Sequence, residues 1–330
     1  MSSTFFGRCI YVNAFGGPEV LTPGTTTVAA PQAGEAVIRY TVIGVNFADT
    51  YQRSGDVHND ALNPPFIPGM HGVGVVVALG ADVSGLAVGD RVTYVGGPGA
   101  YTEYRRLPAH RLIRLPDELS DELLAAAYAR GLTCQYLLKQ LHKVQPGETI
   151  LVHAAAGGVG QLLVQWAKHL GATVIGTVGT KAKAEQVKAL GCDHAIVYTE
   201  EDFVERVQDI TGGAGVPVVY DSVGAATFHK SLACLSPAGL AINYGTASGP
   251  VPPLSLQDLH SKSLSVCRPT MRNWIATREA LETASADVFE MLKLGVLSIK
   301  VDQVLGLEQA AQAHTLLESR TVKGAIVLKT

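Results

Sequence analysis

The sequence predicts an α/β protein that combines a doubly wound parallel sheet with a second, antiparallel and barrel-like β unit, with a cleft between them. Three observations predict this fold. Short Val- and Ile-rich runs alternate with helical apolar spacing over residues 149–244, extended segments separated by Gly, Pro and Asp fill residues 35–125, and 330 residues are enough for two hydrophobic cores.

The antiparallel unit is indicated by short extended runs bounded by turn residues. Such runs, recurring at short intervals, are typical of a barrel or sandwich. The predicted strands cover residues 35–45, 72–79, 90–95 and 100–107.

The parallel sheet is indicated by strands and helices that alternate along the chain. This order builds parallel strands with right-handed crossovers and helices on both faces. Gly171 and Gly191 stand where helices should end in a left-handed residue. The predicted strands are 149–154, 173–177, 194–198, 216–221 and 240–244, and the predicted helices are 159–170, 182–190, 201–210 and 225–235.

The last 60 or so residues carry helical spacing at 279–294 and 308–319 and an apolar run at 324–328. These elements cannot form a sheet of their own, so we expect them to pack on the first β unit. The predicted domains are therefore residues 1–126 with 269–330, and residues 127–268. An exposed edge strand near residues 264–267 favours a homodimer.

The composition excludes several classes of protein. It is 47% hydrophobic and 17% charged, and apolar runs such as 73–79 are too short to cross a bilayer. No export signal opens the sequence, so a cytoplasmic location is expected. A net charge of −3 gives no field that would attract nucleic acid or an anionic membrane. Five scattered cysteines argue against disulfides and against a Cys-rich zinc site.

A glycine-rich turn lies between the strand at 149–154 and the helix at 159–170. In His153-Ala-Ala-Ala-Gly-Gly-Val-Gly160, the spaced positions of a dinucleotide fingerprint are held by Ala154, Gly157 and Gly160. Small residues let a pyrophosphate approach the free N–H groups of a helix N-terminus. Alone, this run could be a tight turn, but the repeated βα pattern favours a Rossmann nucleotide site.

The end of the second parallel strand selects between NAD and NADP. An Asp or Glu that would bind a ribose 2′-hydroxyl is absent, and Lys181 and Lys183 follow the strand. Lysines attract a 2′-phosphate, so NADPH is predicted. The alternative is that the lysines only solvate a first helical turn, where they are unfavourable to the helix dipole.

Six segments together resemble the zinc-free NADPH:quinone oxidoreductases (zeta-crystallin-like) of the medium-chain dehydrogenase/reductase superfamily. The resemblance covers nearly the whole chain and implies a GroES-like β-barrel-type catalytic domain beside the Rossmann domain. The segments are Gly16–Leu21, Gly44–Tyr51, Gly89–Val92, Ala154–Gly160, Val219–Gly224 and Leu317–Arg320.

The resemblance also implies that the site holds no metal. Zinc-dependent relatives carry Cys, His and Glu where this chain has Asn46, Met70 and His71. A catalytic zinc needs about three N, S or O protein ligands. Without a Lewis acid, alcohol oxidation lacks alkoxide stabilisation, whereas a quinone accepts hydride into a conjugated system. A quinone or a similar conjugated carbonyl compound is therefore the expected substrate.

By the same resemblance, Asn46 would hydrogen-bond near the nicotinamide ribose or the quinone oxygen, and Tyr51 with Arg53 would line the acceptor pocket. These are expected to orient the substrate rather than to act as acid or base. Three of the implied residues also have a structural alternative: Tyr198 could cover a strand edge, Tyr244 could be a core residue, and Arg320 could complement a helix dipole. No catalytic role is expected for His71. The implied cofactor residues are Asn46, Thr133, Ala155, Gly157, Gly158, Val159, Gly160, Gly179, Lys183, Tyr198, Ser222, Tyr244, Gly245, Ser248 and Arg320.

Two other functions stay open at this point. One is an NADPH-dependent reductase of the activated double bond in enones or alkenals. The other is an NADPH-regulated nucleic-acid-binding or structural protein, for which the sequence offers neither a basic stripe nor interleaved aromatic residues.

Overall fold

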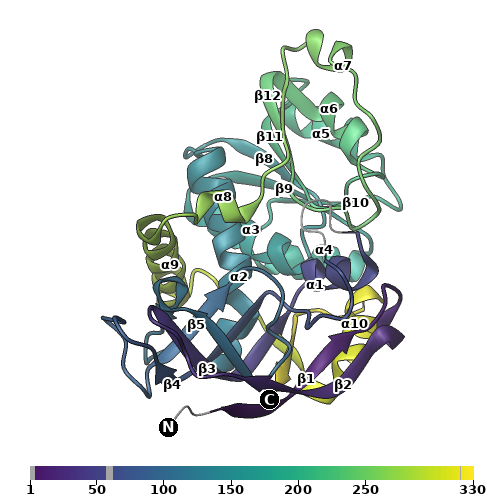
Figure 1. The fold of residues 1–330 in the computed structure, drawn as a ribbon. Coiled ribbons are helices and arrows are strands. Elements are labelled where there is room, and N and C mark those ends of the chain that lie inside the picture. Colours follow the sequence, from purple (N-terminus) through teal and green to yellow (C-terminus); the bar gives the residue numbers. More distant parts are fainter. Residues whose placement is uncertain (1–3, 57–61, 320) are drawn as a thin grey trace. The chain divides into compact units, whose positions relative to one another are not determined.

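The structure, a computed structural model, describes residues 4–56, 62–319 and 321–330. The chain divides into two compact units, which are coloured along the sequence in Figure 1. The first unit comprises Met1–Ala129, Thr277–Phe289 and Ile299–Thr330, and the second comprises Arg130–Ala276 and Glu290–Ser298. The predicted domain boundaries near residues 126 and 268 stay a prediction.

The first unit is built on a seven-stranded sheet in the order β14-β15-β3-β4-β5-β7, with β6 paired to β3. The last strand of the chain lies inside this sheet, parallel to β14 and antiparallel to β3. Strands β14 and β15 therefore join the first unit as expected, whereas Glu290–Ser298, which includes the end of the predicted helix at 279–294, belongs to the second unit. The strands are β3 (Glu35–Val45), β4 (His71–Leu79), β5 (Arg91–Val95), β6 (Tyr104–Pro108), β7 (Ile113–Arg114), β14 (Val301–Gly306) and β15 (Ala325–Lys329).

Two helices and a hairpin complete the core of the first unit. Strands β1 (Phe5–Val12) and β2 (Leu21–Val28) form an antiparallel pair that the sequence did not predict. Helix α10 (Ala310–Glu318) contacts β2 and β15, and the short α1 (Phe47–Ser54) begins directly after β3. Asn46 and Asp49 form a capping box at the start of α1, and Gly55 ends it in a left-handed conformation.

The second unit contains a six-stranded parallel sheet in the order β10-β9-β8-β11-β12-β13. This is the doubly wound order, whose direction reverses between β8 and β11, and ligands bind at such a reversal beyond the carboxyl ends of the strands. The strands are β8 (Thr149–Val152), β9 (Thr173–Val178), β10 (His194–Val197), β11 (Val216–Asp221), β12 (Leu235–Asn243) and β13 (Ser265–Cys267).

The helices of the second unit follow the predicted alternation, and Figure 1 shows α3 to α6 beside the strands that they connect. Gly171 and Gly191 have φ values of 86° and 98°, which confirms their predicted places after two helices. The helices are α3 (Gly158–His169), α4 (Lys181–Ala189), α5 (Phe203–Thr211), α6 (Phe228–Cys234), α7 (Gln257–His260) and α8 (Met271–Trp274); α2 (Asp121–Tyr136) and α9 (Arg278–Lys293) complete the chain.

One predicted strand begins later than expected. Residues 100–103 do not continue β6, because the Tyr101 amide donates to Pro68 O (2.9 Å) and the Thr102 amide to Ala100 O (2.8 Å). Among the described residues, every helix is too short or too polar to traverse a lipid bilayer.

Candidate functional site

The glycine-rich turn joins β8 to α3 in the second unit. Ala154 has a φ of 50°, and its carbonyl accepts from the amide of Gly157 at 2.8 Å. The amide of Ala155 donates to Thr177 O at 3.0 Å, which ties the turn to β9. The first amides of α3 are thereby presented at the carboxyl end of the sheet, where a helix N-terminus attracts an anion.

Two glycines of this turn have no room for a side chain. A Cβ on Gly160 would lie 2.3 Å from Ala154 O, and one on Gly158 would lie 2.7 Å from Arg130 Nε. The glycines therefore permit close packing of helix against strand. The guanidinium group of Arg130, which is buried, adds positive charge beside the first residue of α3. Sequence reasoning missed Arg130, because nothing in its neighbourhood shows that α2 meets this turn.

His153, which directly follows β8 at the start of the glycine-rich turn, is a structural residue. Its ring nitrogens lie 2.9 Å from Thr177 Oγ1 and 2.8 Å from Ser231 Oγ. Burial lowers the pKa of His153, with Asp221 acting in the opposite direction. The neutral ring bridges β9 and α6 beneath the turn. On α2, the Sγ of Cys134, which follows the predicted cofactor residue Thr133, donates to Val159 O at 3.6 Å.

A second group of predicted cofactor residues lies at the end of β9. Thr180 caps α4, its hydroxyl accepting from the amide of Lys183 at 3.3 Å. Gly179 adjoins Tyr198, since a Cβ there would lie 2.8 Å from the phenol oxygen. Lys181 forms an ion pair with Glu200 at 3.2 Å. The structure thus brings Gly179, Lys183 and Tyr198 to one corner of the sheet, with no carboxylate at the end of β9 itself.

The third group lies at the carboxyl ends of β11 and β12. The buried carboxylate of Asp221 accepts from the amides of Val223 (2.6 Å) and Gly224 (3.0 Å), and so shapes the turn that carries Ser222. The hydroxyl of Ser248 donates to Val223 O at 2.8 Å, which joins the loop after β12 to that turn.

Tyr244 and Gly245 begin the loop after β12. The amide of Tyr244 donates to Asp221 O at 2.8 Å, and Gly245 O accepts from the Asn243 side chain at 2.8 Å. Burial raises the pKa of the Tyr244 phenol, which is therefore a proton-bearing donor at neutral pH. Predicted residues of all three groups thus lie along the carboxyl edge of one sheet. Arg320 lies outside the described residues.

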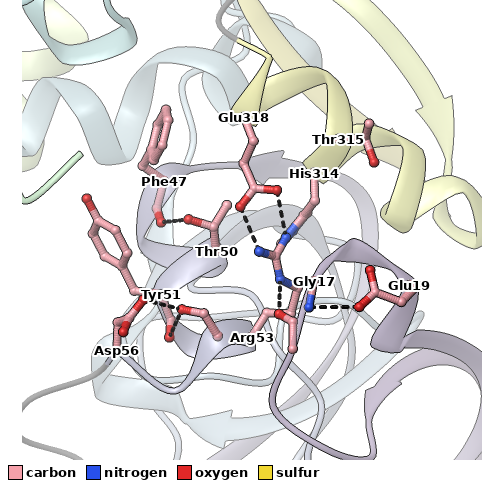
Figure 2. A network of polar contacts seen from close by, with 12 residues as sticks. Gly17, Glu19, Phe47, Thr50, Tyr51, Arg53, Asp56, His314, Thr315 and Glu318 are labelled. Atoms are coloured by element: carbon pink, nitrogen blue, oxygen red, sulfur yellow. Dashed lines mark hydrogen bonds and ion pairs between the residues drawn. The ribbon is translucent and has the colours of Figure 1, made fainter. Parts of the chain in front are cut away.

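In the first unit, Figure 2 shows the predicted acceptor-side residues Tyr51 and Arg53 on α1, and Asn46 is the residue just before this helix. The amide of Asn46 donates to Asp49 Oδ2 at 2.8 Å, and its side-chain nitrogen donates to Gly44 O at 3.2 Å. The half-buried Tyr51 lies one turn further on, its ring 6.4 Å from that of Phe47. Both side chains offer hydrogen-bond donors.

Arg53 has a different environment. It is only 4% exposed, and its guanidinium group makes two bonds to Glu318, of 2.6 and 3.1 Å, and one to Gly16 O of 3.0 Å (Figure 2). It therefore fastens α1 to α10 and to the loop before β2. Whether Arg53 also lines an acceptor pocket stays a prediction.

The residues at the expected metal positions do not suit zinc. Asn46 and Met70 offer an amide and a thioether, whereas zinc takes Cys thiolate, His nitrogen and carboxylate oxygen ligands. His71 is fully buried, with its ring 5.7 Å from that of Tyr128. Throughout residues 4–56, 62–319 and 321–330, no three His, Cys, Asp or Glu side chains gather as a metal-binding group.

Comparison with known proteins gives matches over nearly the whole chain. The family described as alcohol dehydrogenase GroES-like domain matches residues 32–117, and the family described as zinc-binding dehydrogenase matches residues 158–286. A 2-haloacrylate reductase from Burkholderia is 44% identical, covering 95% of this chain and 96% of its own length. A quinone oxidoreductase from Pseudomonas aeruginosa is also 44% identical, with coverages of 96% and 97%.

Among solved structures, the Escherichia coli quinone oxidoreductase complexed with NADPH is 41% identical and has a TM-score of 0.94. The match covers 98% of this chain and 100% of that one. A GroES-like unit and a Rossmann unit define the medium-chain dehydrogenase/reductase superfamily, so the predicted fold class is confirmed. Within that superfamily, the chain belongs to the quinone oxidoreductase family, as the sequence motifs indicated.

Proposed function

We propose that this protein is an NADPH-dependent quinone reductase that works without a metal ion. The observation that carries the proposal is the match to quinone oxidoreductases over nearly the whole chain, and one of these relatives was solved with NADPH. The chain also has a glycine-lined turn at the position where the cofactor would bind. Oxidoreductase chemistry is common to these relatives, including the 2-haloacrylate reductase.

The residues of the second unit fit NADPH. Gly158 and Gly160 let the start of α3 pack closely against the turn, and the residues that would hold a pyrophosphate at this helix N-terminus are Ala155, Gly157, Gly158, Val159 and Gly160. Lys183 and Tyr198, with Gly179, would hold the 2′-phosphate, because a cation and a phenol favour an anion that a carboxylate would repel. The remaining contacts would come from Thr133, Ser222, Tyr244, Gly245, Ser248, Asn46 and Arg320.

Bound NADPH supplies the hydride. The chain supplies proximity and orientation: Asn46 and Tyr51 donate hydrogen bonds to the acceptor oxygen or to the nearby ribose. The charge that develops on a quinone oxygen is delocalised over a conjugated ring, so hydrogen bonds stabilise it without the Lewis acid that an alcohol oxidation needs. Asn46 and Met70 are consistent with this, because they do not form a zinc ligand set.

A second candidate is the reduction of an activated carbon–carbon double bond. The Burkholderia 2-haloacrylate reductase is as similar to this chain as the quinone oxidoreductases are. Both substrates are conjugated acceptors that take hydride at carbon or oxygen without a metal, so the same site chemistry serves either.

Stopped-flow absorbance tests the two candidates side by side. The protein is mixed with NADPH or NADH and with benzoquinone, a naphthoquinone, 2-chloroacrylate or an enone. We expect rapid NADPH oxidation with the quinones, and much slower oxidation of NADH. Failure to oxidise NADPH with any quinone contradicts the proposal, and a larger kcat/KM for 2-chloroacrylate or the enone assigns the second function.

The cytoplasmic location, the homodimer and the domain limits at residues 126 and 268 are part of the same proposal. Strand β13 leaves one side of the parallel sheet for a partner, and Val266 on it is exposed. Sedimentation of the purified protein distinguishes a dimer from a monomer.

A further inference from the structure

The carboxylate of Asp49 holds together two segments that are distant in sequence. It is fully buried, and its two oxygens accept from different amides: Oδ2 from Asn46 at 2.8 Å and Oδ1 from Met70 at 3.1 Å. On the same face of α1, Gln52 Oε1 accepts from the amide of Gly69 at 2.9 Å. Helix α1 thereby fixes both its own first residue and the segment before β4.

Two buried side chains in turn hold Asp49. The phenol oxygen of Tyr101 lies 3.2 Å from Asp49 Oδ2, and His314 Nε2 lies 2.9 Å from that phenol oxygen. The rings of Tyr101 and His314 meet edge to face, with centroids 5.7 Å apart. Both residues are fully buried, so water does not compete for these bonds.

The contact with Arg53 sets the direction of the hydrogen bonds that link His314, Tyr101 and Asp49. A guanidinium group only donates, so the 3.3 Å contact makes His314 Nδ1 an acceptor and leaves the ring proton on Nε2. His314 then donates to Tyr101, and Tyr101 donates to Asp49. Burial, and secondarily Arg53, lowers the pKa of His314 to about 3, which keeps the ring neutral at neutral pH. Each of these hydrogen bonds has one assigned donor and one assigned acceptor, so the network fixes the orientation of its groups.

We propose that Tyr101 and His314 are positioning residues for the acceptor site: they fix the Asp49 carboxylate, which in turn fixes the backbone at Asn46 and Met70. This inference rests on the proposed function, in which Asn46 orients the acceptor. Neither residue needs to touch the substrate. Their effect reaches it through the position of the Asn46 amide side chain, which is set by the backbone that Asp49 holds.

The test compares Tyr101→Phe with Tyr128→Phe. Both variants remove one buried phenol oxygen in the same unit, but Tyr128 bonds to Ser285 at 2.7 Å and has no part in the Asp49 network. Since small misplacements of an orienting group cost up to about 100-fold, we expect Tyr101→Phe to lower kcat/KM for benzoquinone by about tenfold. The NADPH Kd, measured by fluorescence titration, should change much less than kcat/KM in Tyr101→Phe, because Asn46 is the one proposed cofactor contact that Asp49 holds and the cofactor residues of the second unit are unchanged.

A second pair of variants separates the hydrogen bond from the volume. His314→Gln keeps a donor toward Tyr101, whereas His314→Leu does not. We expect His314→Gln to retain most of the kcat/KM for benzoquinone and His314→Leu to lose as much of it as Tyr101→Phe. Equal losses in the Gln and Leu variants would show that a hydrogen bond between residue 314 and Tyr101 is not what holds Asp49.

Hydrogen exchange gives a readout that does not depend on activity. If Asp49 is released, the amides of Asn46 and Met70 should exchange faster in Tyr101→Phe than in Tyr128→Phe. If the wild-type protein reduces no quinone but exchange is faster in Tyr101→Phe, the proposed function is overturned, whereas the role of Tyr101 in holding Asp49 and the backbone at Asn46 and Met70 is kept. Normal quinone reduction and unchanged exchange in Tyr101→Phe would overturn the positioning role alone.

Discussion

The carbonyl oxygen of Ala154 lies 2.3 Å from the point that a Cβ on Gly160 would occupy. Real atoms do not approach so closely, so Gly160→Ala must push α3 away from the turn. We expect the free energy of unfolding to fall by about 1–3 kcal/mol, as is typical of overpacking. NADPH affinity should fall as well, because the first amides of α3 move with the helix.

Denaturant unfolding and fluorescence titration measure the two effects of Gly160→Ala. Gly97→Ala is the control, because nothing lies within 4 Å of the added Cβ there. If both alanine variants unfold at the same denaturant concentration, the close approach at Gly160 does not constrain the turn.

Lys183→Ala should separate NADPH from NADH. We expect the KM for NADPH to rise about tenfold, which corresponds to the loss of ~1.4 kcal/mol of binding, with little change for NADH. The reason is that only NADPH carries the 2′-phosphate that Lys183 would bind. Lys188→Ala on the same helix is the control, since Lys188 pairs with Glu185 instead. An equal rise for both cofactors would remove Lys183 from the phosphate site.

Glu318→Gln should destabilise the first unit. Arg53 is almost fully buried, and Glu318 is its only carboxylate partner among the contacts that Figure 2 shows. Removing the charge leaves a buried guanidinium group with neutral acceptors, which we expect to cost about 1–3 kcal/mol in the free energy of unfolding. Glu185→Gln, on an exposed pair, should cost less than ~0.5 kcal/mol. Thermal unfolding measures both variants, and equal shifts in Tm would show that Arg53 does not depend on Glu318.

His314 should make the protein sensitive to acid. Its pKa is lowered to about 3 in the folded state by burial and by Arg53, against about 6.5 for an unperturbed histidine. As the pH falls, the unfolded state therefore binds a proton at this histidine before the folded state does. The contribution of His314 to the free energy of unfolding is fully present above pH ~6.5. It is lost as the pH falls toward 3, by up to ~1.4 kcal/mol per pH unit.

The comparison of wild type with His314→Gln isolates this contribution, because the other titrating groups are shared. Denaturant unfolding at several pH values from 7 down to 4 should show a shallower decline of stability in the variant. Parallel curves would mean that His314 binds its proton equally in the folded and unfolded states.

The parallel sheet could be predicted from sequence because each strand and helix is specified locally. Strands β9 and β11 lie within a residue or two of the predicted segments. The hairpin of β1 and β2 was missed because its second strand contains Pro23 and Gly24, which are rare inside strands. The start of β6 was misplaced because residues 100–103 are held by Pro68 and Ala100, contacts that no local pattern reveals.

The candidate site was predictable where a motif lies in one continuous stretch, as in the turn from His153 to Gly160. The Asp49 network was not, because Tyr101 and His314 are 213 residues apart in the chain. Arg53 was recognised as a residue of interest, but its pairing with Glu318 across 265 residues could only come from the tertiary structure. Sequence patterns indicate which polar residues are candidates, but the contacts between residues distant in sequence are found only in the tertiary structure.

The placement of β15 has a consequence for how the chain folds during synthesis. Val42–Val45 of β3 pair with β15, Val45 opposite Ile326, so this part of the β3 edge stays unpaired until residues 325–329 have been synthesised, although residues 35–39 on the same side can pair earlier with β6. The parallel sheet needs only residues 149–267 and can form earlier. During that interval the unpaired segment Val42–Val45, with the buried residues Ile43 and Val45, is a strand edge that favours aggregation. Chaperone dependence in the cell should therefore arise from the antiparallel unit, although the parallel unit is the one that would bind the nucleotide.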